Sequence, residues 1–431
     1  MKISNPSFSV SVSKSDYFFV FLSVIFIGSG TLITMGSLDN FGVGSGHANY
    51  EPLIGKAIML LYSFIILAGH NQKPYNMVER NIIIVVIIWG FLQAFKYRLF
   101  PTAVVTRFMN IYFTMVLFTC YGKSLLTILE DVFYKLAVIG FILWVISLII
   151  PSVMQGLCNF SPIKGGGMVE GGSILVFAPN YLDWDPYRNF GFAWEPGRFG
   201  AIMTFGLFIN LVLYNFTLKN NRHFKWFVAA IVSSLSTTAF SVLLFVLYVY
   251  YINQPSKYRI MAFPIFIVGF VLMMSLDFMF AKMQDLSIFN EDHMIEWENG
   301  LDYYAEKDGF YTPQRFESLM LEGLNILHDP IIGNAGSPYE YLQSVFGPKF
   351  SLSNGVLRIF AQMGIPLGML YYYLCFQGSK WLSELFKYKG KYAFILLFML
   401  INFSYSFIFE PVFLSLLFYP YLNKRTLRYA S

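Results

Sequence analysis

The residues best suited to chemistry lie close together between residues 185 and 200. The run Asp185-Pro-Tyr-Arg-Asn-Phe-Gly-Phe-Ala-Trp-Glu-Pro-Gly-Arg-Phe-Gly200 places Arg188, Glu195 and Arg198 among aromatic residues. An arginine keeps its charge and can donate two parallel hydrogen bonds to phosphate oxygens. A nearby carboxylate can accept a proton from a hydroxyl nucleophile. These residue types favour a site for a phosphorylated substrate, although two interfacial anchoring arginines, one paired with Glu195, would give the same pattern.

A second group of candidate residues lies between residues 312 and 355. Thr312-Pro313 supplies a helix N-cap and a proline at the first helical position, and apolar residues then recur at helical spacing. This pattern predicts an amphipathic helix over 313–327 with Arg315 in its first turn, lying on a membrane or covering a cavity. The helix is followed by His328-Asp-Pro-Ile-Ile-Gly333, and Ser351-Leu-Ser-Asn-Gly355 leads into the next apolar stretch.

Three more cations lie within apolar stretches, close to the ends that we expect to face outward. Arg107 is about 6 residues, or roughly 9 Å, into its predicted helix, and Arg358 and Lys56 are near the ends of theirs. Charges inside a membrane usually face a cavity or a partner, so these residues could reach a lipid head group. Lys56 could equally extend its side chain to the interface.

The elements that must position these residues are strongly apolar. Of the 431 residues, 56% are hydrophobic and 13% are charged, and the mean hydropathy is +0.55. A soluble domain usually carries about a quarter charged residues, so the composition excludes an ordinary cytosolic enzyme. The apolar residues form unbroken runs and do not alternate as in the strands of an outer-membrane barrel. We therefore predict an all-α polytopic integral membrane protein.

The distribution of basic residues predicts the topology. Spans of about 20 apolar residues are clearest at Tyr17–Met35, Leu53–Gly69, Ile82–Ala94, Thr102–Cys120, Leu136–Ile150, Phe199–Leu218, Ile260–Phe280 and Gly355–Phe376. Lys and Arg accumulate in cytoplasmic loops. Nearly all basic groups of this chain can face the cytoplasm at the same time only if the stretches 226–252 and 392–421 each enter the membrane and return. The turns then fall within Ser233–Thr238 and at Glu410-Pro411. Lys96 and Arg98 are the exception, because they fall in a short outer loop.

About twelve membrane segments follow, including two short or broken helix pairs, with two long outer loops and both termini cytoplasmic. The predicted regions are N-terminal membrane helices (1–150), a first outer loop (151–198), central membrane helices with the broken pair 226–252 (199–280), a second outer loop with the amphipathic helix (281–354), and C-terminal membrane helices with a basic cytoplasmic tail (355–431). About 20 of the 25 acidic residues then lie outside. The sorting of the basic residues did not require this distribution, so it supports the topology, but only weakly because acidic residues contribute little to orientation.

Other patterns in the sequence do not predict a site. Cys158 would lie outside, whereas Cys120 and Cys375 would lie at or near the inner leaflet. Cys158 then has no partner, and we expect no disulfide framework. Asp292-His293-x-x-Glu296 is interpreted as a solvated acidic loop, and we expect no metal and no cofactor. Lys164-Gly-Gly-Gly-Met-Val-Glu-Gly-Gly172 lacks the spacing of a phosphate-binding P-loop. The net charge of +5 reflects the cytoplasmic basic groups, and nucleic acid is not an expected partner.

The order of these motifs resembles the bacterial O-antigen and capsule polymerases of the Wzy type, in the O-antigen ligase-like superfamily. Arg188-Asn-Phe-Gly-Phe-Ala-Trp-Glu-Pro-Gly, followed at once by a helix, is similar to their first long periplasmic loop. The matching features in the later part are Arg315, Pro330-Ile-Ile-Gly333, Asn354, Gly364-Ile-Pro-Leu-Gly368 and the Ser-rich turn at Ser236-Thr237. The resemblance covers most of the chain from about residue 120 onward.

The resemblance implies an inner-membrane glycosyltransferase that polymerises undecaprenyl-pyrophosphate-linked repeat units at the periplasmic face. Its partners would be this glycan substrate, membrane lipid and a chain-length regulator protein. Arg188, Arg198 and Arg315 are then expected to stabilise charge on the leaving pyrophosphate. Arg107 and Arg358 are further candidates for binding it, Glu195 is the leading base, and Asn354 has a positioning role.

The chain departs from the family at one position that matters for the mechanism. Ser353-Asn354 stands where the related ligases and many polymerases have His-Asn, so a catalytic histidine cannot be assigned there. The general base stays open between Glu195, His328 and no protein base. Two alternative functions stay open. One is an O-antigen ligase, which shares its fold and its donor with the polymerases, and the other is a flippase for the same lipid-linked glycan. Transporters commonly contain internal repeats, of which we find none.

Overall fold

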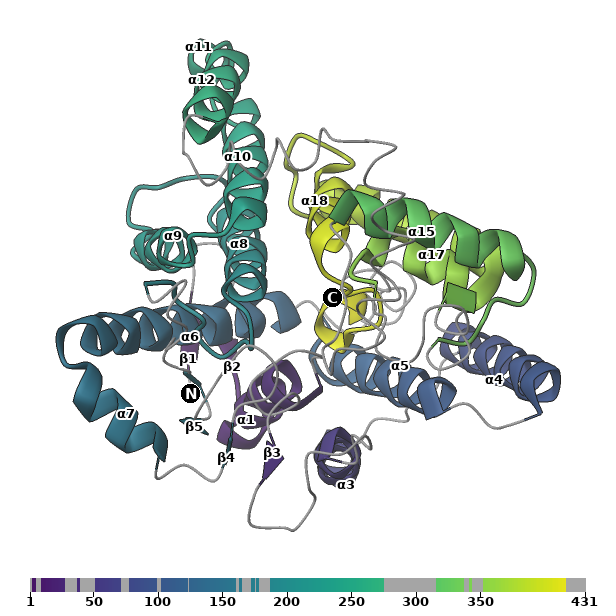
Figure 1. The fold of residues 1–431 in the computed structure, drawn as a ribbon. Helices are drawn as coiled ribbons and strands as arrows, with labels where there is room; N and C mark the ends of the chain where they lie inside the picture. Colours follow the sequence, from purple (N-terminus) through teal and green to yellow (C-terminus); the bar gives the residue numbers. More distant parts are fainter. Residues whose placement is uncertain are drawn as a thin grey trace, which may run out of the picture.

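The structure is a computed structural model of the 431-residue chain. It describes residues 2–4, 9–27, 37–38, 51–70, 77–98, 102–122, 124–159, 163–164, 172–174, 176–177, 187–274, 315–336, 341–342 and 352–415. Among these the chain is mostly helical (Figure 1). The only strands in these ranges are very short: β1 (Lys2–Ser4) pairs antiparallel with β2 (Ser9–Ser11), and β3 (Ser37–Leu38), β4 (Ile163–Lys164) and β5 (Gly172–Ser173) pair in that order.

The first half of the helical framework contains α1 (Lys14–Leu22), the π-helix η1 (Ser23–Ile27), α3 (Glu51–Gly69), α4 (Met77–Tyr97), α5 (Thr102–Tyr121), α6 (Ser124–Ile149) and α7 (Pro151–Asn159). The second half contains α8 (Pro196–Leu213), α9 (His223–Ser233), α10 (Thr237–Ile252), α11 (Ser256–Arg259), α12 (Ala262–Met274), α15 (Arg315–His328), α17 (Gly355–Leu385) and α18 (Ala393–Ser404). The predicted helical class is confirmed at this level.

Three of the described helices, α6, α8 and α17, are long and apolar enough to cross a membrane. Shorter apolar helical stretches lie at Lys56–Gly69, Ile84–Tyr97, His223–Ser233, Thr237–Ile252 and Ala393–Ser404. These lengths and compositions suit a membrane-associated protein.

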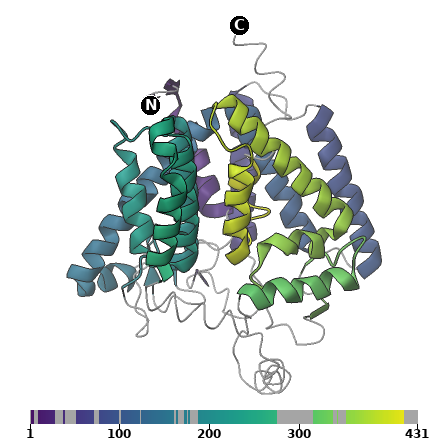
Figure 2. The same ribbon diagram turned by 90° about the horizontal axis from the view of Figure 1, so that it is seen from above.

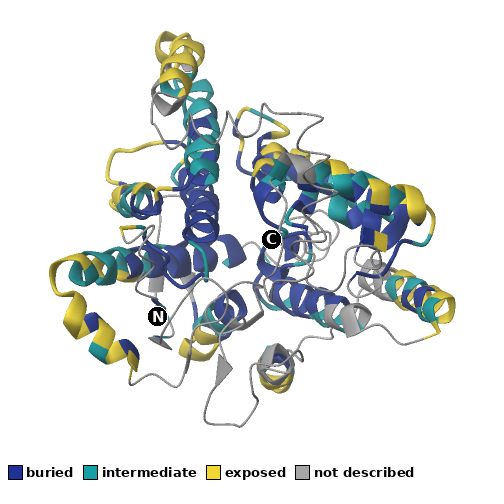
Figure 3. Ribbon diagram, in the orientation of Figure 1, coloured by how far each residue is buried: buried dark blue, intermediate teal, exposed yellow. Residues whose placement is uncertain are grey.

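Helix α8 lies at the centre of the core, and all of its residues are buried (Figure 3). It is apolar on every side, as expected of a helix surrounded by others. Its glycines allow close packing: a Cβ on Gly200 would lie 2.4 Å from the Ser234 hydroxyl, and one on Gly206 would lie 2.7 Å from the Phe227 ring. The first of these contacts brings the link between α9 and α10 against the start of α8.

The helical backbone is interrupted at the two places where the helix pairs are predicted to turn. Helix α9 ends at Ser233 and α10 begins at Thr237, with the Ser236 hydroxyl accepting a hydrogen bond from the Ala239 amide as the N-cap. Helix α18 ends at Ser404, and helical backbone resumes at Pro411. The segment between them, residues 405–410, is non-helical and central to the site described below.

Helix α17 differs from the uninterrupted span predicted over Gly355–Phe376. Its backbone leaves the helical region at Gly364 (φ 78°, ψ 164°). Pro366 has no amide hydrogen, so the Gln362 carbonyl loses its helical partner and instead accepts from the Ala335 amide (3.2 Å). The Ile365 amide turns to the Pro330 carbonyl (2.7 Å). The turn after α15 therefore inserts its backbone into the break in α17.

Helix ends gather at two opposite sides of the bundle. At one side, the Asn189 amide donates to Ser233 O (2.9 Å) and the Thr238 hydroxyl to the Ser404 hydroxyl (2.7 Å). Helix α15 lies across this side, while the β1–β2 hairpin lies at the other (Figure 2). At the other side, Asn253 donates to the Lys389 carbonyl (3.0 Å). We call these the loop end and the basic end.

Candidate functional site

Tyr405 joins the two loops that carry the candidate residues. Its hydroxyl donates to Glu195 Oε1 (2.9 Å), and Arg315 Nη2 lies 3.5 Å from the same oxygen. The Arg315 guanidinium also lies 5.2 Å from the centroid of the Tyr405 ring. Arg188 donates from Nε to the Ser234 carbonyl (3.1 Å) and is close enough for its charge to act on the Tyr405 hydroxyl. We call Arg188, Glu195, Arg315 and Tyr405 the Tyr405 centre.

The Glu195-Pro-Gly sequence explains how this arrangement forms. Glu195 is the N-cap residue of α8 with extended backbone, and Pro196 occupies the first helical position, where its missing amide hydrogen costs nothing. The Glu195 side chain does not cap its own helix and turns to Tyr405. A Cβ on Gly197 would lie 1.8 Å from the Tyr405 hydroxyl. Only glycine at position 197 lets the ring come this close.

The Tyr405 centre is accessible from the loop end. The side chain of Arg315 is 31% exposed and that of Glu195 is 15% exposed. Arginine donors beside a carboxylate, at the positive end of a helix, can bind an anionic group while the carboxylate accepts a proton from a neighbouring hydroxyl. The centre therefore brings together the residue types, arginines and a carboxylate, on which the prediction for this region rests.

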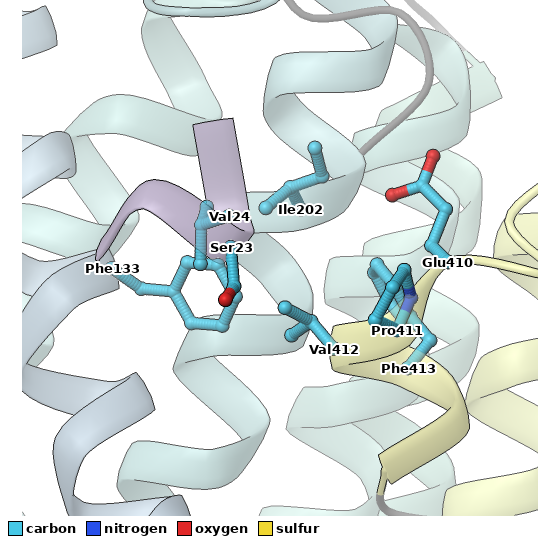
Figure 4. A pocket seen from close by; sticks show the side chains of 8 residues that line it. All are labelled: Ser23, Val24, Phe133, Ile202, Glu410, Pro411, Val412 and Phe413. Atoms are coloured by element: carbon cyan, nitrogen blue, oxygen red, sulfur yellow. The ribbon is translucent and has the colours of Figure 1, made fainter. Parts of the chain in front are cut away.

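Arg198 lies deeper and is engaged within the protein. It forms an ion pair with Glu410, both side chains being less than 10% exposed, and its guanidinium lies 4.2 Å from the Phe407 ring centroid. Glu410 and residues of η1, α6 and α8 line a small, mostly apolar pocket beside this pair (Figure 4). Lys56 is also close enough to act electrostatically on Glu410. The structure thus places Arg198 in an internal ion pair, away from the accessible arginines.

Arg107 and Arg358 both bind the backbone of the second loop. Arg107 is buried and donates from Nη2 to the Ala335 carbonyl (2.6 Å) and Gln362 Oε1 (2.8 Å), with its guanidinium 5.1 Å from the Phe409 ring centroid. Arg358 donates from Nη1 to the Leu352 carbonyl (2.6 Å). These contacts anchor the second loop to α5 and α17.

His328 and Arg315 occupy opposite ends of α15. The 14-residue helix separates them by about 20 Å at 1.5 Å per residue. His328 Nδ1 lies 3.1 Å from Asp329 Oδ2, and its ring stacks on Tyr341 with the centroids 4.5 Å apart. The structure therefore does not bring His328 to the Tyr405 centre.

Asn354 is completely buried and holds two elements together. Its side-chain oxygen caps α17 by accepting from the Val356 (3.0 Å) and Leu357 (3.2 Å) amides, and its amide nitrogen donates to the Phe403 carbonyl (3.1 Å). These contacts fix the start of α17 beside the end of α18. Asn354 thus helps to position the segment that carries Tyr405.

The sequence predicts a turn at Glu410-Pro411 but singles out none of the aromatic residues in segment 405–410, whose rings contact three arginines. Tyr405, Phe407 and Phe409 alternate along it, and Arg315, Arg198 and Arg107 lie over them in that order. The alternation directly before Glu410-Pro411 is the signal in the sequence. Each arginine comes from a different part of the chain, so the pairing itself requires the fold.

Lys96, the exception to the predicted topology, has a partner in the second loop. It forms an ion pair with Asp329, which also accepts a hydrogen bond from the Tyr97 hydroxyl (3.1 Å). Burial raises the pKa of Asp329, but hydrogen bonds from Lys96 and His328 outweigh it and hold this pKa below its ordinary value. The position of Lys96 at the loop end is therefore explained by its ion pair with Asp329.

Within the described ranges, no group of three or more His, Cys, Asp and Glu side chains is arranged to hold a metal ion. The predicted solvated segment Asp292-His293-x-x-Glu296 lies outside those ranges, as do residues 165–171 of the glycine-rich run. Cys120, Cys158 and Cys375 are free thiols.

Comparison with known proteins found no protein-family model, no curated protein and no solved structure that matches this chain. A function for the chain therefore has to be inferred from its own residues and their arrangement.

Proposed function

We propose that the chain is a bacterial inner-membrane glycosyltransferase that joins undecaprenyl-pyrophosphate-linked repeat units into O-antigen or capsular polysaccharide. The observation that carries the proposal is the Tyr405 centre, where Arg188 and Glu195 from one long loop meet Arg315 from the other. The motifs that resemble this family, far apart in the sequence, contact each other there. The break at Gly364 adds support, because Pro330-Ile-Ile-Gly333 docks into Gly364-Ile-Pro-Leu-Gly368.

In this proposal the loop end faces the periplasm and the basic end faces the cytoplasm. About twelve membrane segments, with both termini cytoplasmic, connect them. The support is that Lys389 is held at the opposite end of the bundle from the Tyr405 centre, next to the end of α10. A basic cytoplasmic side is the usual arrangement in helical membrane proteins.

The proposed reaction is a glycosyl transfer between two lipid-linked chains. A hydroxyl of one repeat unit attacks the anomeric carbon of the first sugar of another chain, and the bond from that carbon to the pyrophosphate oxygen breaks. Undecaprenyl pyrophosphate leaves with the electron pair. Arg188 and Arg315 stabilise the charge that grows on it, since preorganised donors act most strongly where charge develops. The attacking hydroxyl transfers its proton to Glu195, which later releases it to water.

The geometry favours Glu195 over His328 as the general base. A base must lie within hydrogen-bond reach of the proton that it accepts, and Glu195 lies beside Arg315 whereas His328 is about 20 Å away along α15. Arg198 and Arg107 take the role of holding the segment 405–410 and the second loop in place. Arg358 and Asn354 position the start of α17.

The test is complementation of a deletion strain with Arg315→Ala, Arg188→Ala and Glu195→Gln. We expect each variant to accumulate in the membrane but to leave lipopolysaccharide capped with a single repeat. His328→Ala is the matched control, because it changes a residue at the other end of the same helix, and it should restore long chains. Wild-type chain lengths in both arginine variants would refute the assignment.

The deletion strain itself separates the proposed polymerase from its two rivals. Complete polymer that remains on the carrier lipid would indicate an O-antigen ligase. Repeat units trapped in the inner leaflet would indicate a flippase. Only single-repeat-capped lipopolysaccharide agrees with a polymerase.

A further inference from the structure

Helix α15 turns a polar face inward and an apolar face outward. Ser318, Glu322 and Asn325, spaced i, i+4 and i+7, are completely or almost completely buried. On the opposite side, Met320, Leu324 and Leu327 are 52%, 46% and 77% exposed with the same spacing. A helix on the surface of a water-soluble protein has the reverse distribution, with its apolar stripe facing the core.

Hydrogen bonds fix the inward orientation of the polar face. The Leu342 amide donates to Asn325 Oδ1 (3.2 Å), and Asn325 donates to Glu322 Oε2 (3.2 Å). The hydroxyl of Ser353 contacts that of Ser318 (3.2 Å). Rotating the helix to bury its leucines would break these bonds and leave buried polar groups without partners, which is costly. The outward position of the apolar stripe is therefore imposed by the fold.

The two helices that hold the turn after α15 also expose large apolar side chains. The turn after α15 carries Ile331, 67% exposed, and is held to α4 because Trp89 and Gln93 both donate to the Ile332 carbonyl. The Pro330 carbonyl in the same turn accepts from the Ile365 amide of α17. The large apolar side chains exposed on these two helices include Phe91, Phe95, Ile365 and Met369.

We infer that α15 lies in the membrane interface at the loop end, with Met320, Leu324, Leu327 and Ile331 among lipid acyl chains. In the orientation proposed above, this interface belongs to the outer leaflet. The exposed apolar side chains on the two helices that hold this turn favour lipid over another occupant, since α17 is itself long and apolar enough to cross a membrane. Helix α15 lies across the end of the bundle (Figure 2), the orientation of an interfacial amphipathic helix. The inference concerns only the contact of this apolar stripe with lipid, and it does not depend on the proposed glycosyl transfer.

The test places an environment-sensitive fluorophore on the full-length protein in lipid discs of phosphatidylethanolamine and phosphatidylglycerol. Single labels go on Met320→Cys, Leu324→Cys and Leu327→Cys in a Cys120→Ser background, because Cys158 and Cys375 are buried. We expect strong quenching by lipids that carry a nitroxide on the acyl chain and protection from aqueous iodide. Lys219→Cys, in an exposed loop at the basic end, is the control and should show the opposite pattern.

Two results would overturn the inference. Iodide quenching of all three labels, without quenching by nitroxide lipids, would mean that the stripe faces water. Protection from both quenchers would mean that a second copy or another protein covers it. Because the labelled side chains are exposed, the substitutions leave the core packing unchanged. Thermal unfolding of each labelled protein checks that it is folded.

Discussion

Three arginines lie over three rings of one short segment, and they differ in what surrounds them. Arg198 over Phe407 and Arg107 over Phe409 are buried and bound to protein groups, a carboxylate in one case and a carbonyl and an amide oxygen in the other. Arg315 over Tyr405 is 31% exposed, and its contact with Glu195 is long at 3.5 Å.

The comparison shows that burial decides which of these arginines is engaged within the protein and which can bind a ligand. The attraction between the guanidinium and an aromatic ring is present at all three positions and is stronger where the guanidinium is buried. A buried guanidinium must have its charge compensated by the protein, which leaves little capacity for a ligand. An arginine at the accessible end can exchange a weak contact for a phosphate at little cost. The sequence alone placed Arg188, Arg198 and Arg315 in one class, and the structure separates Arg198 from the other two.

The largest expected effect that tests this comparison is on stability. Arg198→Ala leaves the Glu410 carboxylate buried without its partner, so we expect the free energy of unfolding to fall by about 3–5 kcal/mol. Arg315→Ala removes a partly exposed contact, for which about 0–1 kcal/mol is expected. Chemical denaturation of the purified proteins in detergent measures both.

A double variant sharpens this prediction. Replacing Arg198 and Glu410 together by Leu and Met removes both charges, and because apolar residues often substitute well for a buried pair, much of the stability should return. Equal losses for Arg198→Ala and Arg315→Ala would contradict the distinction between a buried and an accessible arginine.

A smaller effect is expected where Arg107 holds the second loop. A Cβ on Gly364 would lie 1.9 Å from the Ile331 carbonyl oxygen, and Gly364 has a positive φ that disfavours other residues. We expect Gly364→Ala to cost about 1–3 kcal/mol through backbone strain alone. Gly323→Ala is the matched control, because nothing lies within 4 Å of the Cβ position of Gly323. Alanine in place of glycine inside a helix should stabilise the protein by about 0.5–1 kcal/mol. A thermal shift assay compares the two, and similar unfolding temperatures would argue against docking of the turn.

The breaks in the helices could be predicted because they follow from local features of the sequence. The apolar stretches 226–252 and 392–421 are too long for one span, and the distribution of charge indicated that each turns back. The turn between α9 and α10 lies in the Ser-rich run of the first stretch, and the non-helical segment before Pro411 lies in the second. The interruption at Gly364 was also visible, since Pro366 cannot continue the hydrogen-bond ladder. The span predicted over Gly355–Phe376 followed from length and apolar content alone, and it therefore contained no interruption.

The contacts of the site could not be predicted, because they join residues far apart in the sequence. Tyr405 and Glu195 are 210 positions apart, and Lys96 and Asp329 are 233 apart. With aromatic residues making up 19% of the chain, nothing distinguished Tyr405 from its neighbours. The residue types in the loops identified Glu195 and Arg315 as candidates, but only the fold shows that they meet and that His328 does not join them.

The smallest expected effect concerns Asp329, which binds Lys96 at the far end of α15 from Arg315. The pKa of Asp329 in the folded protein is below its ordinary value. The ionised carboxylate therefore stabilises the fold fully at a pH above the ordinary pKa, and this stabilisation is lost as the pH falls through the pKa of the folded state. Asp329→Asn should therefore be less stable than the wild type at neutral pH, by about 0–1 kcal/mol because Lys96 is partly exposed. The difference should vanish in strong acid, where the wild-type carboxyl is protonated.

Thermal unfolding of both proteins between pH 7 and pH 3 measures this difference. The other carboxylates are common to both proteins, so their contributions cancel in the comparison. Lys96→Met removes the other partner and should reduce the pH dependence in the same way. A difference between wild type and Asp329→Asn that stays constant down to pH 3 would mean that the ion pair does not hold the end of α15. In that case the docking of the second loop would depend on Arg107 and on the backbone contacts at Gly364.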